Sequence, residues 1–169
     1  MCFDLSVART ERWLWDVAAG LAAGTEPWER GAGGAPGTRS FELIARTSTY
    51  EAWVIAWPTG GGLELHDHGG SSGAFCVVSG TLDETVARLG SPQRRHRRHG
   101  AGTGAVFDAS HIHDIVNVSG ALATSVHVYT PHLSTMTFYA PGDDGLLVAT
   151  RTEIATEPEH PSVALTVSA

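Results

Sequence analysis

The spacing of apolar residues along the chain changes near residue 38. Between Leu5 and Gly24, apolar side chains recur every three or four positions, which is the period of an amphipathic helix. Beyond residue 38, short runs rich in Val, Ile, Thr and aromatic residues alternate with Gly, Pro, Ser and Asp, as in antiparallel sheets. The pattern predicts one helix, followed by strands at 41–46, 51–57, 63–68, 74–80, 82–88, 104–108, 113–118, 123–130, 135–139 and 146–151.

A single N-terminal helix followed only by short strands indicates an all-β fold. We expect a small antiparallel β-barrel or double-sheet sandwich with a helical cap. The chain has 169 residues, 42% of them hydrophobic, which suits one domain with one core. That domain would span residues 1–169, with the helical cap and linker at 1–37, the barrel at 38–151 and a peripheral tail at 152–169.

The charge balance excludes several classes of partner. Eleven basic residues, all arginine, against 18 acidic residues give a net charge of −7. Such a chain is poorly suited to nucleic acid or anionic membranes, and no apolar run is long enough to span a bilayer. The one basic cluster, Arg94 to His99, contains no aromatic residue, so we interpret it as a solvated hairpin rim.

Cellular location is an expectation from two features. The first residues lack the basic-then-apolar order of a secretory signal. The two cysteines, Cys2 and Cys76, could form at most one disulfide, which argues against a disulfide framework. We expect a cytoplasmic protein that is a monomer or a weak homodimer.

Two of the nine histidines end a predicted strand as His66-Asp67-His68. Side chains two residues apart on a strand share a face, so His66 and His68 point the same way and Asp67 points to the other face. A pair of this kind is found at metal sites, and core histidines give the same pattern.

A second motif strengthens the metal interpretation. Gly60, five residues and His66-x-His68 are followed much later by Asp108, His113 and Asn117. These segments resemble the two short motifs of the cupin superfamily. The glutamate ligand of the first motif is replaced by Gly73, so three histidines remain as candidate ligands. Zinc with hydrolytic chemistry and Fe(II) with oxygen chemistry both suit such a set.

Four longer segments resemble the thiol dioxygenases, and cysteine dioxygenase above all. They are His66–Gly73, Val78–Glu84, His113–Ser119 and Ser125–Pro131, within a similarity that covers residues 38–151. The most specific element is Ser125-x-His127-x-Tyr129, whose alternation puts three polar side chains on one strand face, where they can form a hydrogen-bonded relay.

The resemblance implies a set of roles. His66, His68 and His113 would ligate Fe(II), and Tyr129, His127 and Ser125 would form a catalytic relay beside a small thiol and O₂. The implied activity is oxidation of L-cysteine to cysteine sulfinic acid. Oxidation of 3-mercaptopropionate or another small thiol is an alternative, as are a zinc hydrolase and a cupin that binds a metal or ligand without turnover.

Substrate recognition is the least determined part of the prediction. The family holds the substrate carboxylate with an arginine, for which Arg39 and Arg46 are candidates, and Trp57 matches a family tryptophan. Arg39 shares the face of Phe41 and is preferred, because Arg46 lies on the opposite face of a regular strand.

Two further expectations concern the neighbourhood of the site. The cysteine that forms a thioether with the tyrosine in eukaryotic members of the family maps to Gly73. Cys76 points away from that position, so no cross-link is predicted. We expect His111 at the rim, with a role behind the metal ligands as the alternative. His96, His99, His132 and His160 have no neighbours of the kind that a metal site requires.

Overall fold

The computed structural model of the protein describes residues 5–25 and 39–155. Most of the predicted linker, the end of the predicted tail and Cys2 lie outside these residues. The described elements are α1 (Leu5–Ala23), β1 (Ser40–Arg46), β2 (Glu51–Trp57), β3 (Gly62–His66), β4 (Ser72–Ser79), β5 (Thr81–Arg88), β6 (Ser91–Gly100), β7 (Gly104–Phe107), β8 (Ile112–Asn117), β9 (Ala123–Thr130), β10 (Thr135–Pro141) and β11 (Leu147–Ile154). The predicted helix and all ten predicted strands are present.

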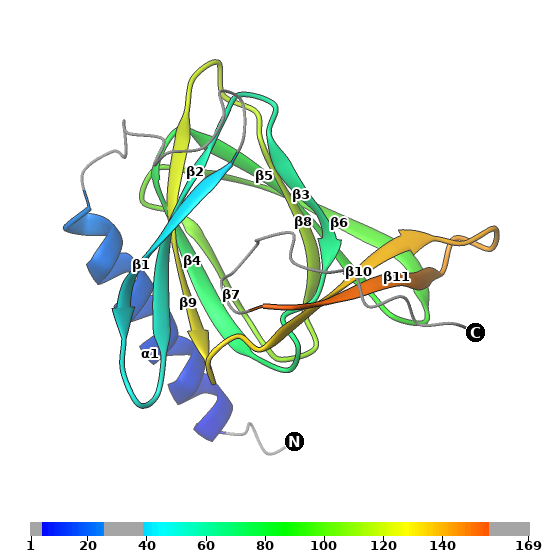
Figure 1. The fold of residues 1–169 in the computed structure, drawn as a ribbon, viewed down its shortest axis with the longest axis horizontal. Coiled ribbons are helices and arrows are strands. Elements are labelled where there is room, and N and C mark those ends of the chain that lie inside the picture. Colours follow the sequence, from blue (N-terminus) through cyan, green and yellow to red (C-terminus); the bar gives the residue numbers. More distant parts are fainter. Residues whose placement is uncertain (1–4, 26–38, 156–169) are drawn as a thin grey trace.

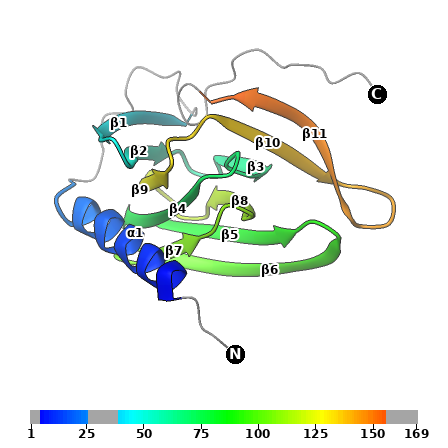
Figure 2. The same cartoon turned by 90° about the horizontal axis from the view of Figure 1, so that it is seen from below.

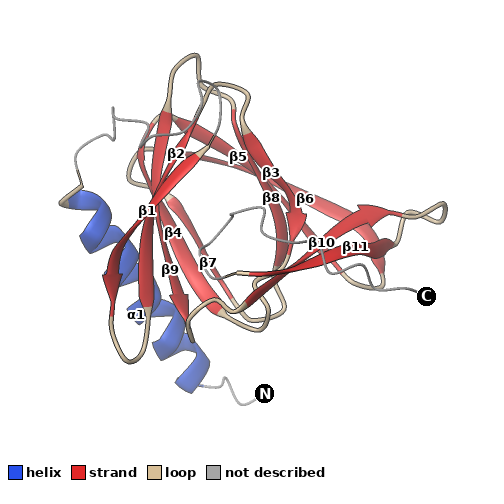
Figure 3. Cartoon of the chain, viewed as in Figure 1, coloured by secondary structure: helices blue, strands red, loops and turns tan. Residues whose placement is uncertain are grey.

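The strands form two antiparallel sheets that face each other (Figure 1). The five-stranded sheet has the order β1-β2-β9-β4-β7, and the six-stranded sheet has the order β11-β10-β3-β8-β5-β6. Helix α1 lies outside the five-stranded sheet, at the lower left in Figure 2, on the side of β4 and β7. The structure thus has the predicted cupin-type fold: two sheets that enclose the core, with one helix as a cap (Figure 3).

Helix α1 covers the outer face of the five-stranded sheet with an apolar stripe. Leu14, Ala18 and Ala22 are buried and recur every four residues, so they lie on one side of the helix. They pack against Cys76 and against apolar residues of the sheet that include Val126. No described helix is long and apolar enough to cross a membrane.

Strand β9 is buried on both faces from Ala123 to Tyr129. Val126 and Val128 point outward beneath the helix. Ser125, His127 and Tyr129 alternate with them and therefore point between the sheets. The same alternation that packs the helix delivers three polar side chains to the interior.

The basic cluster Arg94 to His99 lies in a hairpin and is exposed except for the half-buried Arg94 and the buried His99, in line with the interpretation from the sequence, but the strand β6 that carries it was not predicted. Strand β6 pairs along its length with β5 in antiparallel register. It lies at the edge of the six-stranded sheet, where charged residues are common because they discourage pairing with other chains. Its sequence therefore lacks the apolar alternation by which strands are predicted. Strand β11 also continues to Ile154, beyond the predicted end of the barrel.

The packing of α1 can be tested by replacing Leu14 with alanine. Leu14 is fully buried, so the cavity left by Leu14→Ala should cost about 2–5 kcal/mol in the free energy of unfolding. Leu89 is 56% exposed, and Leu89→Ala should change it by less than about 0.5 kcal/mol. Urea unfolding measures both values, and equal losses would contradict the docking of α1 on the sheet.

Candidate metal centre

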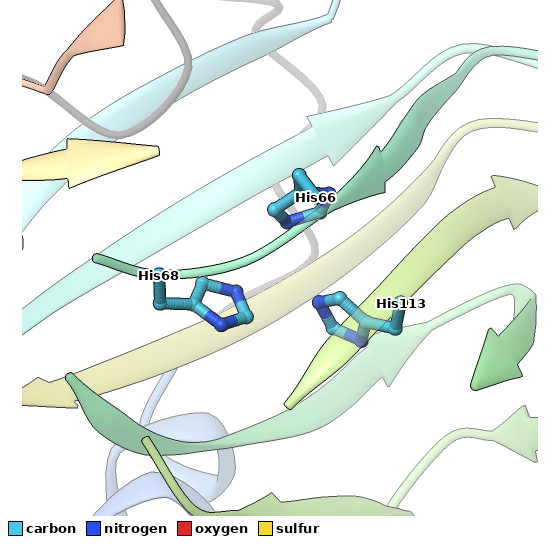
Figure 4. Close-up of side chains that lie close together, drawn as sticks. All are labelled: His66, His68 and His113. Atoms are coloured by element: carbon cyan, nitrogen blue, oxygen red, sulfur yellow. The ribbon is translucent and has the colours of Figure 1, made fainter. Parts of the chain in front are cut away.

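Three histidine side chains converge between the sheets (Figure 4). His66 ends β3, His68 follows two residues later, and His113 lies on β8 as the cross-strand partner of His66. Their ring centroids are 4.8–5.0 Å apart. One nitrogen from each ring lies within 4.8 Å of the others. All three side chains are buried, so the structure brings the predicted ligand set together.

The hydrogen bonds of two rings assign their ligand atoms. His66 Nδ1 lies 2.7 Å from the carbonyl oxygen of Glu64, and His113 Nδ1 lies 2.8 Å from Glu84 Oε1. In both rings Nδ1 must donate a proton, because the partner is a pure acceptor. The Nε2 lone pairs of His66 and His113 are then available for a metal, as in other sites where an acceptor holds the opposite ring nitrogen.

His68 supplies the strongest local sign of a ligand. Both of its ring nitrogens are buried and have no hydrogen-bond partner among the described residues. Buried polar atoms in native proteins almost always have a partner, because an unpaired one loses its hydration without compensation. A metal held with His66 and His113 would satisfy one of these nitrogens, so the residues fit such an ion.

The three rings are also in the protonation state that metal binding needs. Burial, followed by the nearby charge of His113, holds the pKa of His66 well below its ordinary value. Burial and the charge of His66 do the same to the pKa of His68, and burial lowers the pKa of His113. Neutral imidazoles offer lone pairs without a prior loss of protons.

A buried carboxylate, Glu84, connects His113 with two histidines that the sequence did not assign to the site. Glu84 Oε1 accepts hydrogen bonds from His113 Nδ1 and from His111 Nε2 at 3.1 Å, and Oε2 accepts from His99 Nε2 at 2.9 Å. Burial alone would raise the pKa of Glu84, but the hydrogen bonds from His111, His113 and His99 outweigh it and hold that pKa far below its ordinary value. Glu84 therefore carries a negative charge beside a candidate ligand.

The expectation for His99 needs correction, and for His111 the structure favours the alternative over the rim position. His99 lies on β6 and faces inward to Glu84, and the side chain of His111 is only 13% exposed against the same carboxylate. The sequence did not predict where His99 points because the strand at 91–100 was not recognised. Once β6 is recognised, alternation along it puts His99 on the same face as its cross-strand partner Leu82, and hence of Glu84.

The predicted relay lies on the opposite sheet. His127 Nε2 lies 2.9 Å from Ser125 Oγ, and Tyr129 Oη lies 3.3 Å from His127 Nδ1. Trp57 Nε1 donates to Ser125 Oγ at 2.8 Å, so the tryptophan extends the chain of hydrogen bonds by one member. The Tyr129 ring lies 5.3 Å from the ring of His68, which places the end of the relay beside the histidine cluster.

The tryptophan also gives the relay a direction. An indole nitrogen can only donate, and Ser125 Oγ has no described partners besides Trp57 and His127. Because Ser125 is buried and its hydroxyl proton has no other described acceptor, this proton is donated to His127 Nε2. Burial lowers the pKa of His127 to about 3, so its ring is neutral with its one proton on Nδ1. That proton goes to the Tyr129 oxygen, and the phenol proton is directed elsewhere.

The structure separates the two candidate arginines. The Arg39 guanidinium carbon lies 5.3 Å from the centre of the Trp57 ring, and Nη1 donates to the carbonyl of Gly62 at 3.3 Å. The Arg39 charge also contributes to the lowered pKa values of His66 and His127, after burial and the charge of His113. Arg39 thus lies beside both halves of the site.

Arg46 pairs with Glu51 at 2.8 Å, at the turn end of β1, and its side chain is 47% exposed. The expected opposition of faces was wrong, because a bulge between Leu43 and Ala45 shifts the register. Arg46 is the cross-strand partner of Glu51 and shares its face. Arg39 and Arg46 therefore differ in their position along the strand rather than in the face on which they lie.

The surroundings of Gly73 argue against a cross-link to Tyr129. Gly73 is the cross-strand partner of Tyr129, but a Cβ atom at this position would lie 2.5 Å from the Phe107 ring and 2.5 Å from the Val128 carbonyl oxygen. Phe107 therefore fills the space that a cysteine side chain would need. Cys76 lies on the outer face beneath α1, as predicted from its parity.

A histidine cluster enclosed by two antiparallel sheets defines a cupin-type protein with a candidate metal site. The chain belongs to the family described as cysteine dioxygenase type I, whose model matches residues 17–141. No curated protein matches the chain.

Solved structures agree with the fold. Recombinant oxalate oxidase in complex with glycolate superposes with a TM-score of 0.55 and 18% identity, covering 68% of this chain and 61% of that one. The chain thus spans less than two thirds of that protein. Peruvianin-I, a cysteine peptidase from Thevetia peruviana latex, superposes with a TM-score of 0.52 and 15% identity, covering 64% and 68%. Such low identities support the fold alone.

The contribution of Glu84 to metal binding can be measured with a matched pair of variants. Glu84→Gln weakens the acceptor that holds His113 and should lower the affinity for a divalent ion about 10–100-fold. Asp83→Asn makes the same charge change on the neighbouring residue of β5, whose carboxylate instead pairs with Arg98, and should leave the affinity within a factor of about two. Calorimetric titration with Co²⁺ or Fe²⁺ compares them. Equal affinities in both variants would exclude a role for Glu84.

The buried relay predicts acid sensitivity of the metal-free protein. His127 has a pKa of about 3 in the folded state, against an ordinary value of 6.5, so the unfolded chain takes up this proton first as the pH falls. The resulting stability is present above about pH 6.5 and is lost toward pH 3, by at most about 1.4 kcal/mol per pH unit. Urea unfolding between pH 7.5 and 5 should show a smaller slope for His127→Gln than for the wild type. Identical slopes would contradict a neutral His127.

Proposed function

We propose that the protein is an Fe(II)-dependent thiol dioxygenase that oxidises L-cysteine with O₂ to cysteine sulfinic acid. The observation that carries the proposal is the set of three neutral histidines facing the Ser125–His127–Tyr129 relay. A binding protein needs the first feature but not the second. Family membership supports the same class, since it suggests an oxidoreductase that acts on a small substrate with O₂.

His66, His68 and His113 would hold the metal through three neutral nitrogens. When bound, Fe(II) would supply a centre at which a thiolate sulfur and O₂ can be brought together. The three imidazoles leave the full double charge of the ion in place. An anionic thiolate is therefore favoured over neutral ligands at such a centre.

Tyr129 would act at the reacting end of the substrate. Tyr129 Oη would accept the Nδ1 proton of His127, and its own phenol proton would then act beside His68, where charge develops as oxygen is transferred to sulfur. His127 fixes the tyrosine oxygen, and Trp57 fixes the serine that fixes His127. A proton donor held in this way needs little reorganisation during the reaction.

Arg39 would bind the carboxylate of the substrate. Its guanidinium lies against the Trp57 ring, at the serine end of the relay, and planar guanidinium groups bind carboxylates with two parallel hydrogen bonds. L-Cysteine and 3-mercaptopropionate both carry the carboxylate, so Arg39 serves either substrate. The amine of cysteine is the only group that separates the two.

The proposal can be tested by O₂ uptake with three thiols and two arginine variants. The iron-loaded wild type should consume O₂ with L-cysteine and form the sulfinate, and His113→Ala should lose both iron and activity. Arg39→Gln should lower kcat/KM for cysteine about 10–100-fold, the usual effect of losing a charged hydrogen-bond pair. It should leave cysteamine, which has no carboxylate, little changed. Arg46→Gln is the matched control and should retain the activity.

The alternatives give different results in the same experiment. A preference for 3-mercaptopropionate would reassign the substrate within the class. Stoichiometric zinc without iron would favour a hydrolase, and bound iron without O₂ uptake for any thiol would indicate a cupin that binds without turnover. Either of the last two results would overturn the dioxygenase assignment. The cytoplasmic location, the absence of nucleic-acid partners and the monomeric or weakly dimeric state stay predictions.

A further inference from the structure

The basic cluster at residues 94–99 is divided by the two faces of β6. On the outer face, Arg98 forms two hydrogen bonds with Asp83 at 2.6 and 2.8 Å. Arg94, on the same face, donates to the carbonyl oxygens of Ser91, Gln93 and Gly145. These two arginines have structural partners and need no further explanation.

The inner face of β6 is different. Arg97 and Arg95 are the cross-strand partners of Glu84 and Val86, so they share the face that leads to the core. Together with Arg88 at the end of β5 they line a cavity of about 460 Å³. The cavity lies between the β5–β6 hairpin, α1 and the end of β7.

The charges of these arginines are not matched by ion pairs. None of Arg88, Arg95 and Arg97 lies within 4 Å of a carboxylate among the described residues. Two acidic side chains also line the cavity: Asp108 accepts hydrogen bonds from the amide and hydroxyl of Ser110, and Glu11 lies on α1. The charge of Arg88 acts on Asp108, and three guanidinium groups against two carboxylates leave the cavity with an excess of positive charge, which favours an anion.

The remaining walls suit a small molecule. The volume falls in the range of ordinary ligand sites, roughly 300–1,000 Å³. Phe107 contributes an apolar wall and His111 a hydrogen-bonding one. The His111 ring stacks on Phe107 at 5.0 Å and contacts Glu84, so the cavity lies on the far side of these side chains from the three-histidine cluster.

We propose that this cavity binds a small anion bearing a carboxylate or phosphate group, held by Arg95, Arg97 and Arg88. The site is separate from the thiol site, since Arg39 and Trp57 do not line it. Its occupancy does not depend on the dioxygenase activity. Arg95 and Arg97 on the inner face would therefore bind a ligand, while Arg94 and Arg98 on the outer face bind groups of the protein itself.

Calorimetric titration of the full-length protein as purified tests the proposal, with inorganic phosphate and malonate as separate probes. At least one probe should bind with a Kd of about 1 mM or tighter, and the stronger probe assigns the chemistry of the anion. The double variant R95Q/R97Q should weaken binding at least about tenfold. The matched variant R94Q/R98Q removes the same charge from the same strand and should bind within about threefold of the wild type.

Several results would overturn the proposal. One is that neither probe binds up to about 10 mM. Another is equal weakening in both double variants, which would indicate diffuse electrostatic attraction. The third is undiminished binding in R95Q/R97Q, which would indicate that a metal holds the phosphate. Phenylglyoxal labelling with mass spectrometry gives a second measurement on the wild type. Phosphate should protect Arg95 and Arg97 from modification but not Arg46, whose partner is Glu51. If phosphate changed the labelling of all three arginines to the same extent, the proposed site would be contradicted.

Discussion

The hydrogen bond from His113 to the buried carboxylate of Glu84 is the interaction on which the site depends. A carboxylate without solvent contact needs several donors to remain ionised, and three imidazoles supply them. In return the carboxylate fixes the proton of His113 on Nδ1, so that Nε2 faces His66 and His68. If Glu84 were neutral, neither the tautomer nor the orientation of His113 would be determined by its surroundings.

The two sheets divide the chemistry between them. The six-stranded sheet and the segment that follows β3 carry the histidine cluster and Glu84, while β9 of the five-stranded sheet carries the relay. Each relay residue is separated from the next by an apolar residue that packs beneath α1. The helix therefore stabilises the face that holds Ser125, His127 and Tyr129, and a change in its packing would reach the relay through the strand rather than through solvent.

Period-two patterns account for what the sequence could predict. They placed His66 and His68 on one face, aligned Ser125 with His127 and Tyr129, and turned Cys76 away from Gly73. What they missed follows from local departures from the pattern. The bulge between Leu43 and Ala45 reversed the expected face of Arg46. The charged edge strand β6 was not recognised as a strand, so the inward orientation of His99 was not predicted. The partnership of Glu84 with His99 and His111 is made across strands, so no spacing along the chain contains it.

The exchange of a glutamate ligand for Gly73 changes the charge of the whole site. In the usual cupin motif a carboxylate would neutralise part of the charge of the ion. Here the candidate ligands are three neutral imidazoles, and the buried carboxylate of Glu84 accepts a hydrogen bond from one of them, His113. Arg39 adds a positive charge on the same side as Trp57. Under the proposed function, such a centre would attract a ligand with two negative groups, one at the metal and one at the guanidinium, and a thiolate that also carries a carboxylate has both. The absence of a carboxylate at position 73 therefore supports the proposal of a thiol acid as the substrate, rather than a neutral or cationic ligand.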